Sequence, residues 1–314
     1  MSHKANYITF SKKEPELPIF HQPWYLDALC GEDGWKLALV YRNQKIVASL
    51  PYMVRQKGPF RYITMPLLCR MLGPYLTAEF RTQRQEVKLY KELIERLPKV
   101  DYFEQSFHYG VSNWMPFYWQ GYRQTTSYSY VLEPLDDLEK IYQGLDTDYR
   151  NNKIPKAQKQ LRVVHDRPLE AFYEVHERSF RRQGISCPFS FEYLKRLDEA
   201  LAKRQARQLF FAIDEQERIH SVAYVIWDQR AAYYLLAGDD PELRSSGGGI
   251  LIAWEAIRYT CEVLQLPTFD FLGSMIQPIE RVRRQFGARQ QSYFKVRRYH
   301  SKLFQLFNWL KGRD

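Results

Sequence analysis

The sequence lacks long apolar runs and paired cysteines. No stretch approaches the roughly 18 consecutive apolar residues of a spanning helix, and residues 1–6 lack the apolar core of a secretion signal. We therefore expect a cytoplasmic protein. The seven histidines never occur at a metal-ligand spacing, so no metal is expected. Four single cysteines, without a Cys-x-x-Cys pair, favour reduced thiols: Cys30, Cys69, Cys187 and Cys261.

Two nucleotide-binding fingerprints are also missing. Without Gly-x-Gly-x-x-Gly a dinucleotide fold lacks its phosphate turn, and without Gly-Lys-Ser/Thr a P-loop lacks its lysine. A glycine cluster is nevertheless present between an apolar run at 231–237 and a helical pattern from Ile250. Because glycine has no Cβ and a helix start leaves N–H groups unpaired, this order predicts a strand, a phosphate-binding turn and a helix. A flexible surface loop is the alternative. The turn reads Arg244-Ser245-Ser246-Gly247-Gly248-Gly249.

Positive charge is unevenly placed along the chain, which has a net charge of +10. Residues 279–314 hold ten Lys/Arg and two acidic residues, giving +8, and residues 148–167 hold six and two, giving +4. Such concentrations attract anionic ligands, although a solvated basic face is the commoner explanation. Aromatic residues are spread along the chain and form no stripe with lysine, which gives no argument for nucleic acid.

A chain of 314 residues predicts two domains. We place an N-terminal domain at 1–134, a long polar linker helix interrupted at Pro155 at 135–160, and a C-terminal domain at 161–314. The expected fold class is α/β (α+β). Each domain is expected to be a mixed, largely antiparallel sheet flanked by helices, and the glycine turn belongs to the second.

Four motifs carry a resemblance to a known family. Arg-x-x-Gly-x-Gly at 244–249 resembles the pyrophosphate loop of the GNAT superfamily of acyl-CoA N-acyltransferases. Residues 149–157 are similar to the basic Arg-x-x-Ile-x-Lys-Ala stretch of the Fem family of peptidoglycan aminoacyltransferases, with one extra residue and an inserted Pro155. Residues 269–273 resemble the Phe-Asp-x-x-Gly strand. Residues 282–287 resemble the Phe-Lys-x-x-Phe-Gly turn, with Val282-Arg283 in place of Phe-Lys.

The resemblance covers roughly residues 35–300 and implies two tandem GNAT-like domains that use acyl-CoA, with acetyl-CoA the first expectation. It implies that the backbone amides of Arg244, Ser245, Ser246, Gly247, Gly248 and Gly249 hold the coenzyme A diphosphate. Fem enzymes that use aminoacyl-tRNA often carry a coiled-coil arm, and this chain has no heptad insertion. That favours a thioester donor over tRNA.

N-acyl transfer needs a donor to the developing oxyanion and a route for protons. The backbone amides of Leu235, Leu236 and Ala237, where the strand leads into the turn, are the expected oxyanion donors. Asp239 is the favoured general base and Asp270 the second choice, although Asp239 and Asp240 also suit a simple turn. Tyr234 is a candidate proton donor to the leaving thiolate, or a core residue.

The function expected from these residues is N-acyl transfer from acyl-CoA to the amine of an anionic acceptor, an amino sugar or a cell-envelope precursor, by direct attack in a ternary complex. Arg150 and Arg283 are expected to bind that acceptor in a groove between the domains. An aminoacyl-tRNA-dependent transferase and a non-catalytic acyl-CoA or nucleotide-sugar binding protein are the alternatives. Oligomeric state stays open.

The last helical stripe, at 302–311, is amphipathic with basic ends. Such a stripe most often packs on its own domain. The alternative is a peripheral helix that lies on anionic lipid at the inner face of the membrane.

Overall fold

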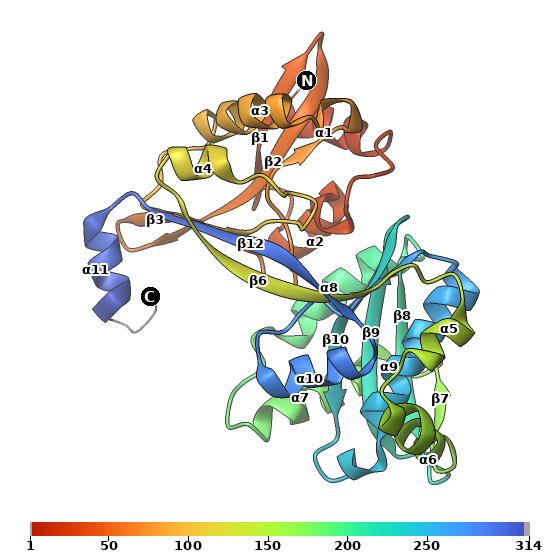
Figure 1. Ribbon diagram of the computed structural model, residues 1–314. Coiled ribbons are helices and arrows are strands. Elements are labelled where there is room, and N and C mark those ends of the chain that lie inside the picture. The colour runs from red at the N-terminus through yellow and green to blue at the C-terminus, as the bar shows by residue number, and fades with distance from the viewer. Residues whose placement is uncertain (1, 311–314) are drawn as a thin grey trace. The chain divides into compact units, whose positions relative to one another are not determined.

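The computed structural model describes residues 2–310, which form two compact units (Figure 1). The first unit runs to Ser127 and also contains the residues from Ser292 onward; the second runs from Tyr128 to Gln291. The expected boundaries at 1–134, 135–160 and 161–314 differ from this division. The last strand joins the first unit because it pairs there, Lys295 opposite Ser106. The 135–160 segment joins the second unit because it contributes to that unit's core.

The first unit is a sheet covered by short helices. β1 pairs with β2 and β2 with β3 in antiparallel fashion, β3 and β5 are parallel, and β12 is antiparallel to β5. β6 and β12 each have residues in both units. The elements are α1 (His3–Ser11), α2 (Pro23–Cys30), β1 (Lys36–Arg42), β2 (Lys45–Lys57), β3 (Phe60–Thr64), β4 (Tyr75–Leu76), α3 (Gln83–Glu95), β5 (Tyr102–Ser106), α4 (Met115–Trp119), β6 (Arg123–Leu132), β12 (Arg289–Tyr299) and α11 (Lys302–Leu310), with 3-10 turns at Ile19–His21 and Ala78–Phe80.

The second unit has the strand order β6-β11-β10-β9-β8-β7. All neighbours are antiparallel except β10 and β11. Its elements are α5 (Leu138–Gln143), a π-helical turn (Tyr149–Lys153), α6 (Ile154–Gln158), β7 (Arg162–Val164), α7 (Leu169–Arg181), α8 (Phe191–Ala202), β8 (Arg207–Ile213), β9 (Ile219–Trp227), β10 (Ala231–Asp239), a 3-10 turn (Arg244–Ser246), α9 (Gly248–Tyr259), a second π-helical turn (Thr260–Leu264), β11 (Thr268–Asp270) and α10 (Gln277–Gln285).

Both units repeat one scheme, in which a helix connects two parallel strands within an otherwise antiparallel sheet. α3 follows β3 and precedes β5 in the first unit, and α9 lies between β10 and β11 in the second. Each unit has its own apolar core, so each buries enough surface to be a domain. The expected fold class, a mixed and largely antiparallel sheet flanked by helices in each domain, is confirmed.

The expected long helix over 135–160 is wrong in form. α5 ends at Gln143, with Gly144 as its C-cap, and the chain turns before the π-helical turn leads into α6. Pro155 does not break the helix: it is the second residue of α6, directly after the π-helical turn Tyr149–Lys153, which replaces the regular α-helical bonding before it. Tyr149, Ile154 and Ala157 are buried, which fixes the segment on the second unit.

Candidate functional site

The glycine turn adopts the conformation that its sequence predicts. β10 ends at Asp239, the 3-10 turn Arg244–Ser246 follows, and α9 begins at Gly248. Gly247 has φ of +81°, a left-handed conformation that glycine adopts without a Cβ clash. The backbone amides of the first turn of α9 therefore lie directly at the turn, which makes this end of the helix suitable for an anion.

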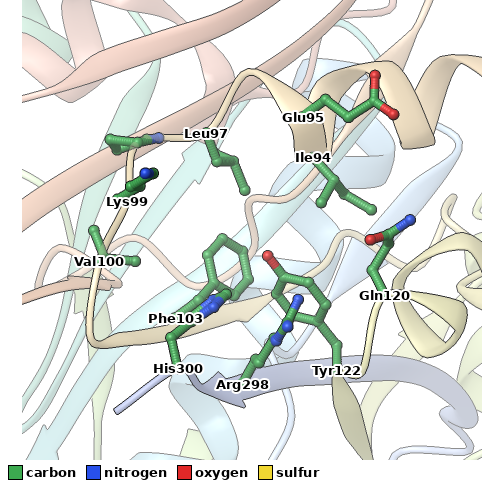
Figure 2. Close-up of a pocket in the computed structure, with 11 residues that line it drawn as sticks. Ile94, Glu95, Leu97, Lys99, Val100, Phe103, Gln120, Tyr122, Arg298 and His300 are labelled. Atoms are coloured by element: carbon green, nitrogen blue, oxygen red, sulfur yellow. The ribbon is translucent and has the colours of Figure 1, made fainter.

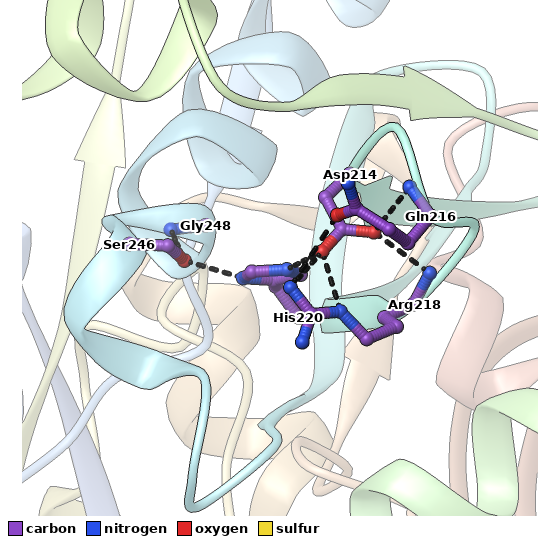
Figure 3. Close-up of polar contacts among 6 residues, drawn as sticks. All are labelled: Asp214, Gln216, Arg218, His220, Ser246 and Gly248. Carbon is purple, nitrogen blue, oxygen red and sulfur yellow. Dashed lines mark hydrogen bonds and ion pairs between the residues drawn. The ribbon is translucent and has the colours of Figure 1, made fainter.

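A polar network fixes the turn to the neighbouring hairpin (Figure 3). Gly248 N–H donates to Ser246 Oγ at 3.3 Å, and Ser246 Oγ lies 2.9 Å from His220 Nδ1. His220 Nε2 lies 3.0 Å from Asp214 Oδ2. Because a carboxylate only accepts, His220 donates to Asp214 through Nε2, and its Nδ1 faces the Ser246 hydroxyl. His220 thus holds the turn in place.

Asp214 is itself held by Arg218, whose guanidinium lies 2.7 Å from its carboxylate. Burial alone would raise the pKa of Asp214, but the hydrogen bonds from His220 and Arg218 outweigh it and the pKa lies well below its usual range. The carboxylate stays ionised and keeps the His220 proton on Nε2. His220 and Asp214 are both buried, which shields this contact from water.

The glycines also allow α9 to start close against β9 and β10. A Cβ on Gly248 would lie 2.6 Å from Ser221 Oγ, and one on Gly249 would lie 2.7 Å from Asp239 Oδ1. Ser221 Oγ donates to the same Asp239 oxygen at 2.7 Å. Side chains at 248 and 249 would therefore displace the strand ends as well as any phosphate.

The edge of β10 that leads to the turn is open. β11 pairs with β10 only from Ala231 to Tyr233, and β10 carries a bulge between Tyr234 and Leu236. Within the described residues, β11 does not follow β10 beyond that point. A bulge re-aims backbone groups, so the amides around Leu235 have no regular strand partner on this side. His176 Nδ1 lies 2.9 Å from the carbonyl oxygen of Ala237 and fixes the backbone there.

Three of the expected site residues come together where β10 and β11 separate. The Arg283 guanidinium carbon lies 5.1 Å from the Tyr234 ring centroid and 4.6 Å from that of Phe271. Burial raises the pKa of the Tyr234 phenol, so it remains protonated, and burial lowers the pKa of Arg283. Asp270 is fully buried; it accepts from the Ser129 hydroxyl and, at 2.7 Å, from Leu272 N–H.

Arg283 is the cation of this cluster that has capacity for a ligand. Its Nε is buried without a hydrogen-bond partner. Burial lowers the pKa of Arg283, while Tyr234, Tyr149 and the Asp270 carboxylate act in the opposite direction. Stacked guanidinium groups keep their edge donors available for a second partner.

Asp239 and Asp240 differ, although they are adjacent. Asp239 is half-buried at the end of β10 and accepts from Ser221. Asp240 lies in the turn, where Arg178 Nη1 approaches to 2.8 Å. Burial would raise the pKa of Asp240, but Glu242 N–H and the Arg178 guanidinium reverse the effect and lower it. Asp240 therefore has a structural role.

Arg150 is not brought together with Arg283. Its Nη1 donates to the carbonyl oxygen of Gln143 at 2.7 Å and so caps the end of α5. The pattern at 149–157 contributes a different residue, because the buried Tyr149 packs on Phe286 with ring centroids 5.2 Å apart. Arg244 and Ser245 are exposed on the glycine turn.

The first unit contains a separate pocket of about 440 Å³ (Figure 2). Arg298, Tyr122 and His300 line one side, and Ile94, Leu97 and Phe103 line the apolar remainder. It is formed by the end of α3, the loop that leads to β5, the residues just before β6 and the end of β12, so it contains none of the expected site residues. The described residues hold no cluster of three or more side chains suited to a metal ion.

Sequence reasoning missed the residues that support the glycine turn. Asp214 and His220 flank a hairpin turn, and Ser221 follows on β9; none stands near the glycines in sequence. No sequence signal indicates them, because only the folding of β8, β9 and β10 into adjacent strands brings His220 to Ser246. His176, which fixes the backbone at Ala237, is buried among Phe172, Phe180 and Phe189.

A glycine turn at a helix start, reached from a strand that separates from its parallel neighbour, is the arrangement expected for the GNAT fold. Residues 149–276, all in the second unit, match the family model for the acetyltransferase (GNAT) domain. No curated protein sequence matches the chain.

Solved structures with the same fold extend over both units. FemX aligns with 99% of this chain and 98% of its own at 11% identity, with a TM-score of 0.70. L-PGS from Bacillus licheniformis aligns with 92% and 91% at 9% identity and a TM-score of 0.57. A tandem GNAT protein from the clavulanic acid biosynthesis pathway aligns with 84% and 83% at 11% identity and a TM-score of 0.53. At these identities the similarity establishes the fold.

Proposed function

We propose that this protein transfers an acyl group from acyl-CoA, with acetyl-CoA the first candidate, to the amine of an anionic acceptor. The observation that carries the proposal is the glycine turn at the start of α9, beside the open edge of β10 and inside the segment that matches the GNAT domain. The amides of residues 244–249 would hold the diphosphate, and the thioester would lie along β10 toward the bulge.

Transfer is direct in this proposal. The neutral amine attacks the thioester carbonyl, and backbone N–H groups at Leu235, Leu236 and Ala237 stabilise the oxyanion. Tyr234, protonated because burial raises its pKa, donates its proton to the leaving thiolate. Asp239, half-buried at the end of β10, accepts the proton that the amine nitrogen loses. Asp270 positions the turn after β11 through its bond from Leu272.

Arg283 supports the anionic acceptor. Its guanidinium carbon lies 5.1 Å from the Tyr234 ring centroid, and its buried Nε has no hydrogen-bond partner in the described chain. An acceptor carboxylate or phosphate would satisfy that donor. Amino sugars linked to a nucleotide and cell-envelope precursors carry such anionic groups. The names of two structural neighbours, FemX and L-PGS, support an acceptor of the cell-envelope class.

Calorimetric titration with acetyl-CoA tests the donor. Arg244 is exposed on the turn. The variant Arg244→Ala should therefore bind acetyl-CoA about three- to tenfold more weakly, which is the range expected for a solvent-screened charged contact. Arg196→Ala is the matched control, because Arg196 is an exposed arginine on α8 of the same unit. A wild-type protein that does not bind acetyl-CoA, or equal affinities in both variants, would contradict the assignment.

The second candidate takes its acyl group from aminoacyl-tRNA. The observation that favours it is the alignment with FemX over almost the whole chain, since residues 149–157 resemble the Fem family. Both candidates use the same fold, so only the donor separates them.

A further inference from the structure

The C-terminal helix α11 is apolar on two sides. Phe304 is buried against an aromatic cluster, with ring centroids 4.9 Å from Phe60 and 5.7 Å from Tyr62. Phe307 lies beside it and contacts Phe60 as well. This face holds the helix on the β2–β3 hairpin and β5 of the first unit.

The opposite side of α11 is exposed but not polar. At about 100° per residue, Leu303, Leu306, Trp309 and Leu310 fall on one arc, away from Phe304. Their exposed fractions are 71%, 52%, 64% and 69%. A surface helix normally places polar residues there, and a large exposed apolar patch marks an interaction site.

The charge around this arc identifies the partner. Lys302 lies on the same arc, and Lys57 lies 5.4 Å above the Phe307 ring. No aspartate or glutamate occurs in the sequence between Glu280 and Asp314, or between residues 53 and 76, where the β2–β3 hairpin lies. Two copies of such a basic surface would repel each other. RNA phosphates would pair with the lysines but would not bury the leucines. A bilayer with anionic lipid satisfies both the apolar and the positive groups.

We propose that the arc formed by Leu303, Leu306, Trp309 and Leu310 is a membrane-binding surface that inserts into the interface of an anionic bilayer. The helix lies in the plane of the membrane, with Trp309 and the leucines at the level of the acyl boundary and lysines at the headgroups. Among residues 2–310, none of the helices has the length and hydropathy of a membrane span. Lys311, the last residue of the helix expected from the sequence, lies outside the described residues.

Vesicle flotation tests this surface. The wild-type protein should float with phosphatidylcholine vesicles that contain about one third phosphatidylglycerol, and salt should weaken the binding. The double variant Leu306→Glu/Leu310→Glu should bind at least about tenfold more weakly. Lys302→Glu should reduce binding to the anionic vesicles and leave the weak binding to pure phosphatidylcholine unchanged.

The matched control is Val263→Glu, which places the same charge on an apolar residue, 61% exposed, in the second unit. It should float like the wild type, and all variants should melt near the wild-type temperature because the changed side chains are exposed. The proposal is overturned if the wild type does not float, if the double variant floats equally well, or if sedimentation shows a dimer that the double variant abolishes. Acetyl-CoA affinity, measured in the same variants, should not change, which separates this surface from the transferase site.

Discussion

Arg283 and Arg284 are adjacent arginines in different environments. Its guanidinium stacks on Tyr234 and Phe271, whereas the adjacent Arg284 is exposed and paired with Glu280 at 3.1 Å. Arg283→Met keeps an apolar stem over the rings and removes the donors. We expect acceptor binding to weaken by about ten- to a hundredfold, since a charge-assisted hydrogen bond contributes about 1.5–3 kcal/mol.

Arg284→Met is the control for this change and should bind acceptor and acetyl-CoA as the wild type does. Equilibrium binding of UDP-linked amino sugars, followed by calorimetry, is the measurement. Equal acceptor affinities in the two variants would assign Arg283 to packing alone.

Two adjacent carboxylates allow a paired test of the base. Asp239→Asn should lower kcat by about a hundredfold or more, because the amide cannot accept the proton that the amine loses. Asp240→Asn should leave kcat unchanged but lower the melting temperature, since Asp240 is paired with Arg178. Steady-state rates, with melting curves for both variants, decide between them. A wild-type kcat in Asp239→Asn would remove the residue from the mechanism.

The buried His21 should make the stability of the first unit depend on pH. Burial lowers its pKa to about 4, and its Nε2 lies 3.2 Å from the carbonyl oxygen of Gly73. The unfolded chain binds the proton near pH 6.5 and the folded chain only near 4, so the unfolded state gains protons first as pH falls. Stability should therefore be complete above 6.5 and decrease by about 3 kcal/mol between 6.5 and 4.

His21→Gln retains a donor for Gly73 but does not titrate, so its stability curve should be flatter over that range. His3→Gln, at an exposed histidine, should retain the wild-type slope. Urea unfolding at several pH values provides the measurement, and equal slopes in all three proteins would show that His21 titrates normally.

At the scale of elements, strand–turn–helix order was the strongest signal in the sequence. β10, the glycine turn and α9 were all expected, because an apolar run, three glycines and a helical pattern follow each other directly. α1, β3 and α4 were not expected. Their sequences have no clear period, and packing on the first unit decides their form. The site was predicted only in part: the sequence indicates the turn, Tyr234, Asp270 and Arg283, but not the His220 network that holds the turn.

The close packing of α9 against β9 changes the expected effect of a glycine substitution. From sequence alone, a side chain at the turn would block phosphate and leave the fold intact. The structure predicts a cost in stability, since a Cβ at Gly248 would lie 2.6 Å from Ser221 Oγ. Gly248→Ala should destabilise the protein by about 1–3 kcal/mol, as in other tightly packed sites.

Ser221→Ala removes the clashing oxygen, so the double variant should be more stable than the two single effects together predict. Chemical denaturation of the four proteins in this cycle gives the coupling energy. Additive effects would mean that α9 shifts away from β9 at little cost.

For the whole molecule, the sequence predicted two similar units but not which residues complete them. Length and repeated element order indicate two domains, whereas the return of β12 to the first unit depends on a pairing between Lys295 and Ser106, far apart in the chain. The net charge of +10 is also a whole-molecule property, and it suits either a polyanionic donor or an anionic surface.

The net charge does not distinguish the two candidate acyl donors, acyl-CoA and aminoacyl-tRNA. If acyl-CoA is the donor, ribonuclease-treated protein should bind acetyl-CoA, and aminoacylated and uncharged tRNA should bind equally weakly. Equal binding is expected because basic segments attract any phosphate backbone, with an affinity that falls steeply as salt rises. Calorimetry for acetyl-CoA and filter binding for the two tRNA forms, each at low and physiological salt, make the comparison. A clear preference for aminoacylated tRNA at physiological salt, without acetyl-CoA binding, would transfer the assignment to the aminoacyl-tRNA-dependent reaction.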